Sequence, residues 1–146
     1  MNIRNMTIND YEPVYALWIN TPNMGLNSLD DSRDGITKYL ARNPTTCFIA
    51  EKNGVIVGVI LSGHDGRRGF IYHMAVSQTE QRQGIGTALV NTAMSALECE
   101  EINKVALVAF VDNAAGNSFW EKMGFTVRDD LVYRNRVINN YETKKS

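Results

Sequence analysis

The sequence has 146 residues, 44% of them hydrophobic and 21% charged, a length and composition that fit one domain with a single core. A net charge of -1 gives no field that would attract nucleic acid or an anionic membrane, and no apolar run reaches the roughly 20 residues that cross a bilayer. The two cysteines are far apart and predict reduced, packed thiols, and the N-terminus carries no export signal, so we expect a cytoplasmic protein.

The N-terminal part of the chain predicts one short strand and two helices. The strand lies around residues 3–6, and apolar residues at helical spacing follow over residues 8–20. A loop at residues 21–28 leads to a second helix, whose first turn carries Asp30 and Asp31. These two helices precede the main sheet.

The middle of the chain predicts three antiparallel strands. The runs Thr46–Lys52 and Val55–Ser62 flank Asn53-Gly54, a dipeptide that strongly favours a two-residue hairpin turn. After another turn, Gly69–Val76 has the composition of a third strand of the meander.

The last third of the chain returns to helical periodicity before further strands. We expect a helix from Gly84 to Leu97, a buried strand from Lys104 to Val111, a short helix from Ala114 to Met123, and one or two final strands from Phe125 onward. The element order is therefore β-α-α-β-β-β-α-β-α-β(-β), an α/β (α+β) domain.

A phosphate-binding turn is predicted between the strand that ends at Val76 and the next helix. Gly84-Ile-Gly86 opens that helix, where free backbone N–H groups and the helix dipole attract phosphate. Residues 81–83 add further donors. The glycines alone could equally serve a tight helix start against the sheet. A dinucleotide-binding turn is disfavoured, because Leu89 replaces its third glycine, and no Walker sequence occurs.

Two segments resemble the GNAT (Gcn5-related N-acetyltransferase) superfamily. Gln81-x-x-Gly84-x-Gly86 is similar to its signature Q/R-x-x-G-x-G/A, which follows the fourth strand. Residues 113–125 are similar to the later segment N-x-x-A-x-x-L/F-Y-E/R-K-x-G-F. The resemblance implies a GNAT fold in a single domain at residues 1–140, with a flexible tail at residues 141–146. Its mixed, mostly antiparallel sheet would have six to seven strands and a splay between strands 4 and 5.

The resemblance also implies acetyl-CoA as cosubstrate, with no metal. The pantetheine arm would lie in the splay and bond the backbone of the fourth strand like an added strand, and the pyrophosphate would sit on the helix start. The implied cofactor-binding residues are Met74, Ala75, Val76, Gln81, Arg82, Gln83, Gly84, Ile85, Gly86, Thr87, Asn113 and Trp120. Asn113 also suits a helix cap.

The implied reaction transfers the acetyl group to a primary amine of a small molecule, or of a protein or peptide N-terminus, by direct attack in a ternary complex. Backbone N–H groups of Met74 and Ala75 would stabilise the oxyanion. The family's tyrosine acid is replaced here by Trp120, whose indole cannot transfer a proton near neutral pH. Tyr72, Tyr133 or water could substitute, or the thiolate could leave without assistance.

His73 is the candidate general base, because it lies on the fourth strand near the expected thioester and histidine exchanges protons near neutral pH. Cross-strand packing would explain the same residue. Glu51 is a weaker candidate. Asp30, Asp31 and Asp34 could hold a cationic amine, although acidic residues also simply favour a helix start.

Two further hypotheses follow. Trp120 in place of tyrosine suggests, as an alternative, a non-catalytic or weakly catalytic acyl-CoA-binding regulatory module. The strands expected after Phe125 often pair across a subunit interface in such folds, so we expect a homodimer. The charge balance favours neither a nucleic-acid partner nor a membrane partner.

Overall fold

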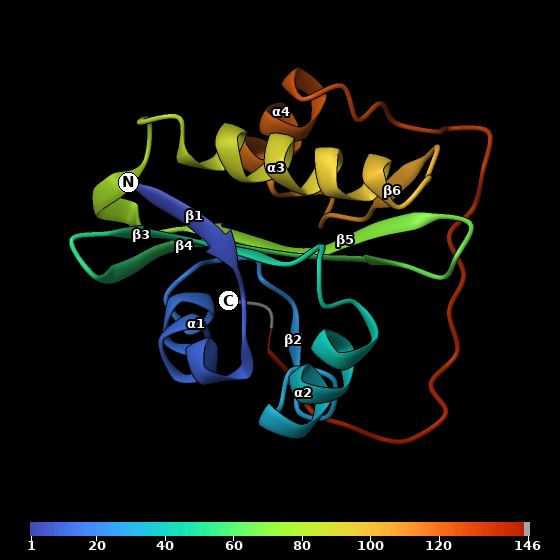
Figure 1. Cartoon of the computed structure of the whole chain (residues 1–146). Helices are drawn as coiled ribbons and strands as arrows, with labels where there is room; N and C mark the ends of the chain where they lie inside the picture. The colour runs from blue at the N-terminus through green and yellow to red at the C-terminus, as the bar shows by residue number, and fades with distance from the viewer. Residues whose placement is uncertain (145–146) are drawn as a thin grey trace.

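A five-stranded sheet separates two layers of helices in the computed structural model, which describes residues 1–144. Helices α3 and α4 cover one face, and α1 and α2 lie on the other (Figure 1). The sheet has the order β1-β3-β4-β5-β6. Its strands are β1 (Asn2–Asn5), β3 (Phe48–Lys52), β4 (Val55–His64), β5 (Gly69–Val76) and β6 (Val105–Leu107). The helices are η1 (Ile8–Asp10), α1 (Tyr11–Ile19), α2 (Arg33–Arg42), η2 (Gln78–Glu80), α3 (Ile85–Cys99) and α4 (Ala114–Lys122).

The first four strands of the sheet are antiparallel, as predicted. The hairpin between β3 and β4 turns at Asn53 and Gly54, whose φ angles of 54° and 77° fit the turn that matches the twist of paired strands. Between β4 and β5 the register shifts, so that Leu61 pairs with His73 and Ser62 with Ile71. Tyr72 is therefore the extra residue of a bulge in the middle of β5.

Each helical layer has its own apolar core against the sheet. On one side, Val14 and Trp18 of α1 and Ile36 of α2 are fully buried against β3 and β4. On the other side, Leu89 and Ala93 of α3 are buried. The spacing of these residues follows the helical periodicity of the sequence, because only one stripe of each helix faces the sheet.

Strands β5 and β6 separate after three residue pairs. They are parallel and paired only from Gly69 to Ile71 on β5 and from Val105 to Leu107 on β6. Strand β5 continues to Val76, whereas β6 ends at Leu107. The predicted splay between the fourth and fifth strands is confirmed, and it opens toward the start of α3.

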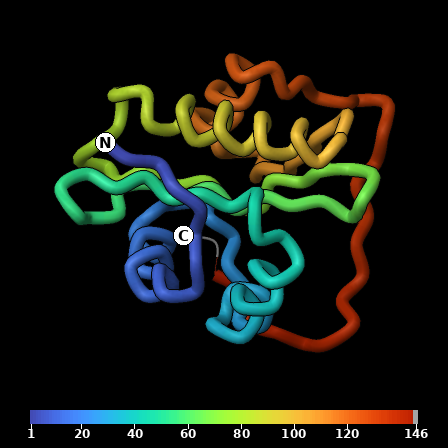
Figure 2. Tube along the Cα trace, viewed as in Figure 1, coloured from blue at the N-terminus to red at the C-terminus, as the bar shows by residue number. Residues whose placement is uncertain are grey.

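Of the one or two final strands predicted from Phe125 onward, one short strand forms, and it lies at the end of the described chain. Between Phe125 and Glu142 the chain has neither helix nor strand, and it runs from α4 down the side of the molecule (Figure 2). Within residues 1–144, β7 (Thr143–Lys144) is the one element that follows, and it pairs with β2 (Leu26–Asn27) in a separate small sheet. The main sheet therefore has five strands instead of six or seven.

The physical reason is that this segment finds no surface to cover. Its apolar side chains remain exposed, including Val127 at 82% and Ile138 at 93%, so strand formation would bury little apolar area. The strand predicted to Val111 also stops early, at Leu107. Strand β7 falls within the tail predicted at residues 141–146, of which residues 145–146 lie outside the described residues.

Candidate functional site

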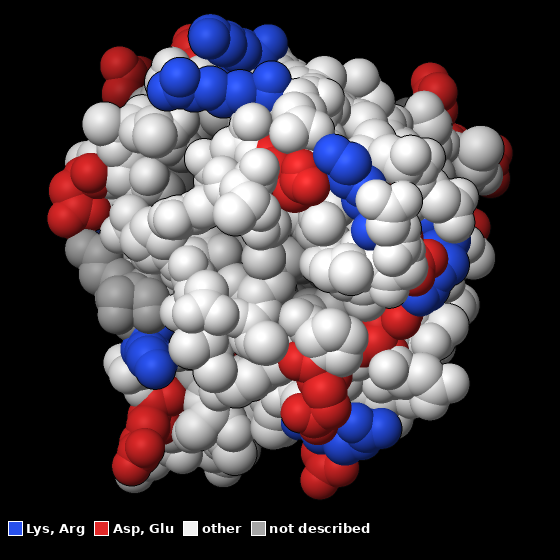
Figure 3. Space-filling view, turned by 90° about the vertical axis from the view of Figure 1, so that its left-hand side faces the viewer, with Lys and Arg blue, Asp and Glu red and all other residues white. Residues whose placement is uncertain are grey.

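A cleft of about 1170 Å³ occupies the splay between β5 and β6. One wall is β5 from Phe70 to Val76, and the opposite wall is the chain after β6 together with α4. Residues 21–25 and Tyr133 close the end nearest α1 and α2. The face that carries the loop before α3 has basic and acidic side chains interspersed around largely uncharged atoms (Figure 3).

The start of α3 opens onto this cleft. Gly84 precedes the helix with φ of 80°, a conformation that side chains rarely adopt. The first hydrogen bond of the helix runs from the Ala88 N–H to the Gly84 carbonyl, at 3.0 Å. The N–H groups of Ile85, Gly86 and Thr87 come before it and have no partner within the helix. Among the described residues no side chain caps this end. The cleft therefore receives a positive helix end with free donors.

The loop before α3 is fixed from outside the cleft. Lys52 Nζ lies 3.3 Å from Glu80 Oε2 and donates to Gln83 Oε1 at 3.4 Å, while Gln83 Nε2 donates to Glu80. Gln83 is thus engaged with β3 and lies outside the cleft lining. Gln81 and Arg82 do line the cleft, and Gln81 Nε2 donates to the Val76 carbonyl at 3.3 Å.

The β5 wall offers backbone groups to the cleft. Met74, Ala75 and Val76 all line it. Beyond Ile71, β5 keeps β4 as its only strand neighbour in the described chain, because β6 has turned away. This half-paired edge can accept an extended ligand through main-chain hydrogen bonds.

The opposite wall places Asn113 and Trp120 beside the cleft. Asn113 Oδ1 accepts the Gly116 N–H at 3.1 Å and so caps α4, as the sequence suggested. Trp120 is half-buried between Phe119 and Phe125, with ring centroids 5.1 and 5.4 Å away in edge-to-face geometry. Aromatic packing therefore fixes the position of the indole.

A histidine–aspartate pair lies at the cleft end near α1, with His73 in the cleft lining and Asp31 buried outside the lining. His73 Nε2 lies 2.8 Å from Asp31 Oδ1, and the two side chains are only 10% and 6% exposed. His73 lines the cleft and packs edge-on against Trp18 at 5.0 Å. Sequence reasoning named both residues but missed their contact, because 42 positions separate them and only the fold brings them together.

The other acidic candidates lie apart from His73. Asp30 is exposed and accepts a hydrogen bond from Asn27 Nδ2 at 3.0 Å, and Asp34 is exposed in the first turn of α2. Glu51 pairs with Arg4 at 2.9 Å on β1 and does not belong to the cleft lining. Asp31 is thus the acidic residue that reaches His73.

The two candidate tyrosine acids, Tyr72 and Tyr133, both line the cleft. Burial raises the pKa of Tyr72, and the neighbouring Tyr133 and Asp30 raise it further. A higher pKa makes the Tyr72 hydroxyl a weaker proton donor near neutral pH.

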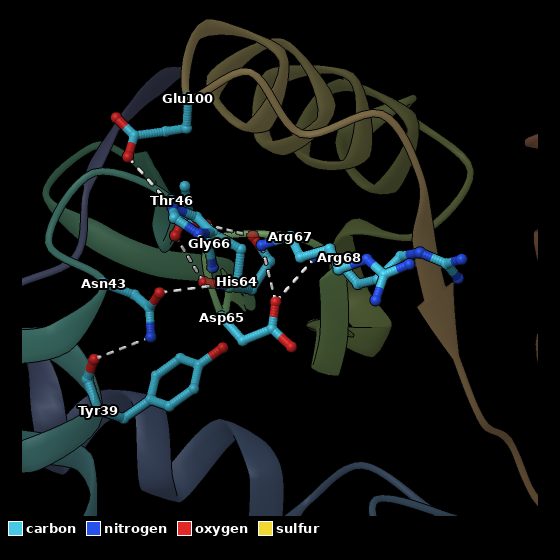
Figure 4. Close-up of polar contacts among 10 residues, drawn as sticks. Tyr39, Asn43, Thr46, His64, Asp65, Gly66, Arg67, Arg68 and Glu100 are labelled. Atoms are coloured by element: carbon cyan, nitrogen blue, oxygen red, sulfur yellow. Dashed lines mark hydrogen bonds and ion pairs between the residues drawn. The ribbon is translucent and has the colours of Figure 1, made fainter.

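A second pocket of about 460 Å³ lies where α2 meets the β4–β5 turn and shares Phe70 and Tyr72 with the cleft. Its polar contacts close the turn onto α2 (Figure 4). Asn43 Oδ1 accepts the His64 N–H at 3.0 Å, and Asp65 Oδ1 accepts two backbone N–H groups of the turn at 2.8 Å. These hydrogen bonds lower the pKa of Asp65. The contacts are those of a structural turn.

Residues 1–144 contain no group of three or more His, Cys, Asp or Glu side chains arranged to hold a metal ion. Within the same range, no helix combines the length and apolar character that spanning a membrane requires.

Comparison with known proteins agrees with this geometry. A protein from Sodalis glossinidius named as an acetyltransferase is 31% identical over 143 residues, which are 97% of this chain and 99% of the relative. Ard1 from Thermoplasma volcanium superposes with a TM-score of 0.75 at 24% identity, over 87% of this chain and 83% of that one.

PaiA N-acetyltransferase from Thermoplasma acidophilum, solved in complex with coenzyme A, superposes with a TM-score of 0.74 at 18% identity, over 88% of this chain and 91% of that one. The family model described as "Acetyltransferase (GNAT) family" matches residues 11–125, a range that contains both walls of the cleft and the start of α3. The chain therefore belongs to the GNAT acetyltransferase family.

Proposed function

We propose that this protein is an N-acetyltransferase that transfers the acetyl group of acetyl-CoA to a primary amine. The acceptor is a small molecule or a protein or peptide N-terminus, and the amine attacks directly in a ternary complex. The observation that carries the proposal is the uncapped N-terminus of α3, which opens onto the cleft between β5 and β6. Coenzyme A in the complex of the similar PaiA protein supports the choice of ligand.

The cleft residues fit the parts of acetyl-CoA. The pyrophosphate would lie on the N–H groups of residues 82–87, where Gly84 and Gly86 leave the backbone accessible and Arg82 adds a positive charge. Gln81 and Gln83 would shape the same loop, Gln83 through its anchor to Lys52. The pantetheine arm would follow β5 at residues 74–76.

The reacting end would lie where the cleft meets α1 and α2. The backbone N–H groups of Met74 and Ala75 would stabilise the oxyanion, and His73 would take the proton of the amine. Asn113 and Trp120 would contact the cofactor from the other wall. Because Trp120 cannot donate a proton, the thiolate would leave unassisted or take a proton from water; a thiol with a pKa near about 8.5 is a fair leaving group.

A second candidate function is an acyl-CoA-binding regulatory module with little or no turnover. The observation in its favour is Trp120, which packs between two aromatic rings where the family's tyrosine acid is expected. Both candidates require the same cofactor site, so they differ in turnover and not in cofactor binding.

Calorimetric titration with acetyl-CoA tests the shared cofactor site. The sharpest variant is Gly86→Glu. A Cβ at this position meets only the Phe119 ring at 3.4 Å and Met74 at 3.7 Å, and glutamate suits a first helical turn. The variant should fold, yet its carboxylate would repel the pyrophosphate. Gly84 is less suitable, because any side chain there strains the backbone.

We expect micromolar acetyl-CoA affinity in the native protein and a loss of at least about tenfold in Gly86→Glu, equivalent to about 1.4 kcal/mol. The control is Asn91→Glu, which adds the same charge to the exposed side of α3 and should bind normally. Absence of acetyl-CoA binding by the native protein would overturn the proposal. A Gly86→Glu variant that binds acetyl-CoA as tightly as the Asn91→Glu control would also overturn it.

A further inference from the structure

In the pair formed by His73 and Asp31, one ring nitrogen of the histidine, Nε2, faces the carboxylate. We propose, on the basis of the acetyltransferase function above, that Asp31 is a positioning residue. It holds the proton of neutral His73 on Nε2, so that Nδ1 is the atom that accepts a proton from the acceptor amine.

The carboxylate of Asp31 is held in place from behind. Its Oδ2 accepts the Asn27 N–H at 2.8 Å, while Oδ1 faces His73. The Tyr11 hydroxyl donates to the Asp31 carbonyl at 2.7 Å and fixes the backbone of the same residue. An ionised carboxylate only accepts hydrogen bonds. The 2.8 Å contact therefore requires His73 to donate from Nε2, so in the neutral ring the proton lies on Nε2 and the lone pair on Nδ1.

The remaining ring nitrogen has a free lone pair. Nδ1 of His73 is buried and has no hydrogen-bond partner among residues 1–144. Leaving a buried polar atom unpaired costs about 1–3 kcal/mol, and such an atom in a native structure calls for an explanation. His73 lines the cleft next to Met74 and Ala75, the proposed oxyanion donors. An amine supplies the missing N–H donor once the neighbouring side chains that cover Nδ1 move apart as the acceptor binds.

Among the titratable side chains around His73, Asp31 is the buried group that carries a charge. Tyr11 of α1 reaches the Asp31 carbonyl, Tyr39 of α2 packs against Tyr72, and Tyr72 precedes His73 on β5. Burial raises the pKa of all three tyrosines, so they are neutral in the working range. Asp30 lies close enough to raise the pKa of Tyr72, but it is exposed and screened by solvent.

The proposed step balances without another reactant. One proton passes from the acceptor ammonium to Nδ1, and the resulting imidazolium is stabilised by Asp31. The neutral nitrogen attacks the thioester carbonyl. The C–N bond forms, the C–S bond breaks, and the electron pair leaves with sulfur. The thiolate leaves unprotonated or takes a proton from water, the nitrogen of the new amide releases its second proton to water, and Nδ1 releases its proton to solvent.

The decisive variant is Asp31→Asn. Its amide oxygen can still accept the Asn27 N–H, while its NH₂ group donates to Nε2 and forces the His73 proton onto Nδ1. Nitrogen-15 NMR of the imidazole should show the Nε2–H tautomer in the native protein and Nδ1–H in Asp31→Asn. We expect kcat to fall by about 10²–10⁴, the usual contribution of general base catalysis, with the KM for acetyl-CoA unchanged.

Two further variants complete the test. Asp129→Asn removes the same charge at an exposed residue outside the cleft lining and should keep the native kcat. His73→Gln keeps a donor toward Asp31 but has no base, so it should lose the same activity as Asp31→Asn and the acid limb of the pH–rate profile. The His73→Gln variant also tests the proposal if Asp31→Asn fails to fold.

Four results would overturn the inference. An Nδ1–H tautomer in the native protein would contradict the geometry directly. A native kcat and pH profile in Asp31→Asn would leave the aspartate a structural role only, and a native kcat and pH profile in His73→Gln would remove the histidine from the reaction. Native protein that binds acetyl-CoA but acetylates no amine would overturn the proposed function and this role with it, whereas the NMR tautomer is measured without substrate.

Discussion

Trp120 is the residue at which this chain departs most clearly from its family's pattern. Its ring is packed between Phe119 and Phe125, and its single N–H cannot serve as a proton-transferring acid. If the thiolate leaves unassisted or through water, an added acid changes little. We therefore expect Trp120→Tyr to keep kcat within about threefold of the native value, measured under saturating acetyl-CoA.

The contrary result would be equally informative. A gain of about tenfold or more in kcat would indicate a degenerate enzyme and favour the regulatory module. The control is Trp120→Phe, which makes the same reduction in ring size without a hydroxyl group and separates the effect of packing from that of proton transfer.

The predictable site residues are those whose role is local in sequence. Gly84 and Gly86 indicate a helix start from the local sequence alone. Asn113 caps a helix through the N–H of the residue three positions later. Asp31 could not be assigned in this way. Its partner His73 comes from another element, and acidic residues before a helix are common for reasons of the helix dipole alone. The role of Gln83 likewise depends on Lys52 of β3.

At the scale of elements, the sequence predicts best where a local pattern decides the structure. Asn53-Gly54 specifies the β3–β4 hairpin, and the apolar stripe of α3 specifies its buried face. No strand forms between Phe125 and Glu142, because β-branched and aromatic residues favour a strand only where a neighbouring edge and a covering surface exist. The length of β6 also depends on its pairing with β5, which no local pattern shows.

The contact between η1 and the first strands makes a pH-dependent contribution to stability. Arg4 donates to both carboxylate oxygens of Asp10, at 2.9 and 2.7 Å, and to Glu51 at 2.9 Å. The hydrogen bonds from Arg4 hold the pKa of Asp10 below its ordinary value of 3.8, and the Thr7 N–H lowers it further. This stabilisation is complete above the unfolded-state pKa and is lost as the pH falls through the lower folded-state pKa.

We expect Asp10→Asn to reduce the free energy of unfolding by about 1–2 kcal/mol near about pH 7, and the difference from the native protein to shrink toward about pH 3. Urea unfolding at the two pH values measures both quantities. Asp130→Asn is the matched control, because Asp130 pairs with Arg128 at 2.8 Å on the exposed surface. A pH-independent difference for Asp10→Asn would contradict this account.

For the molecule as a whole, the two layers of helices cover both faces of the sheet and leave its β6 edge without a neighbouring strand among the described residues. Strand β6 is the last strand of the described sheet, and the chain beyond it exposes Val111 at 97%. The segment at residues 125–142 adds further exposed apolar side chains along the same third of the chain, Val127, Leu131, Val132, Tyr133, Val137 and Ile138. Exposed apolar side chains along one segment could be covered by a second subunit if they form a contiguous patch.

The homodimer expected from the sequence is therefore a prediction about this segment. We expect sedimentation at micromolar concentration to show a species of about twice the 16.4 kDa chain mass, and Leu131→Glu to yield the monomer, because a charge at an apolar interface loses its hydration. Val55→Glu, at the equally exposed first residue of β4 (both 61%), should leave the dimer intact. A native protein that sediments only as a monomer would show that the segment has no subunit to cover, and dissociation by Val55→Glu as well would place the interface elsewhere.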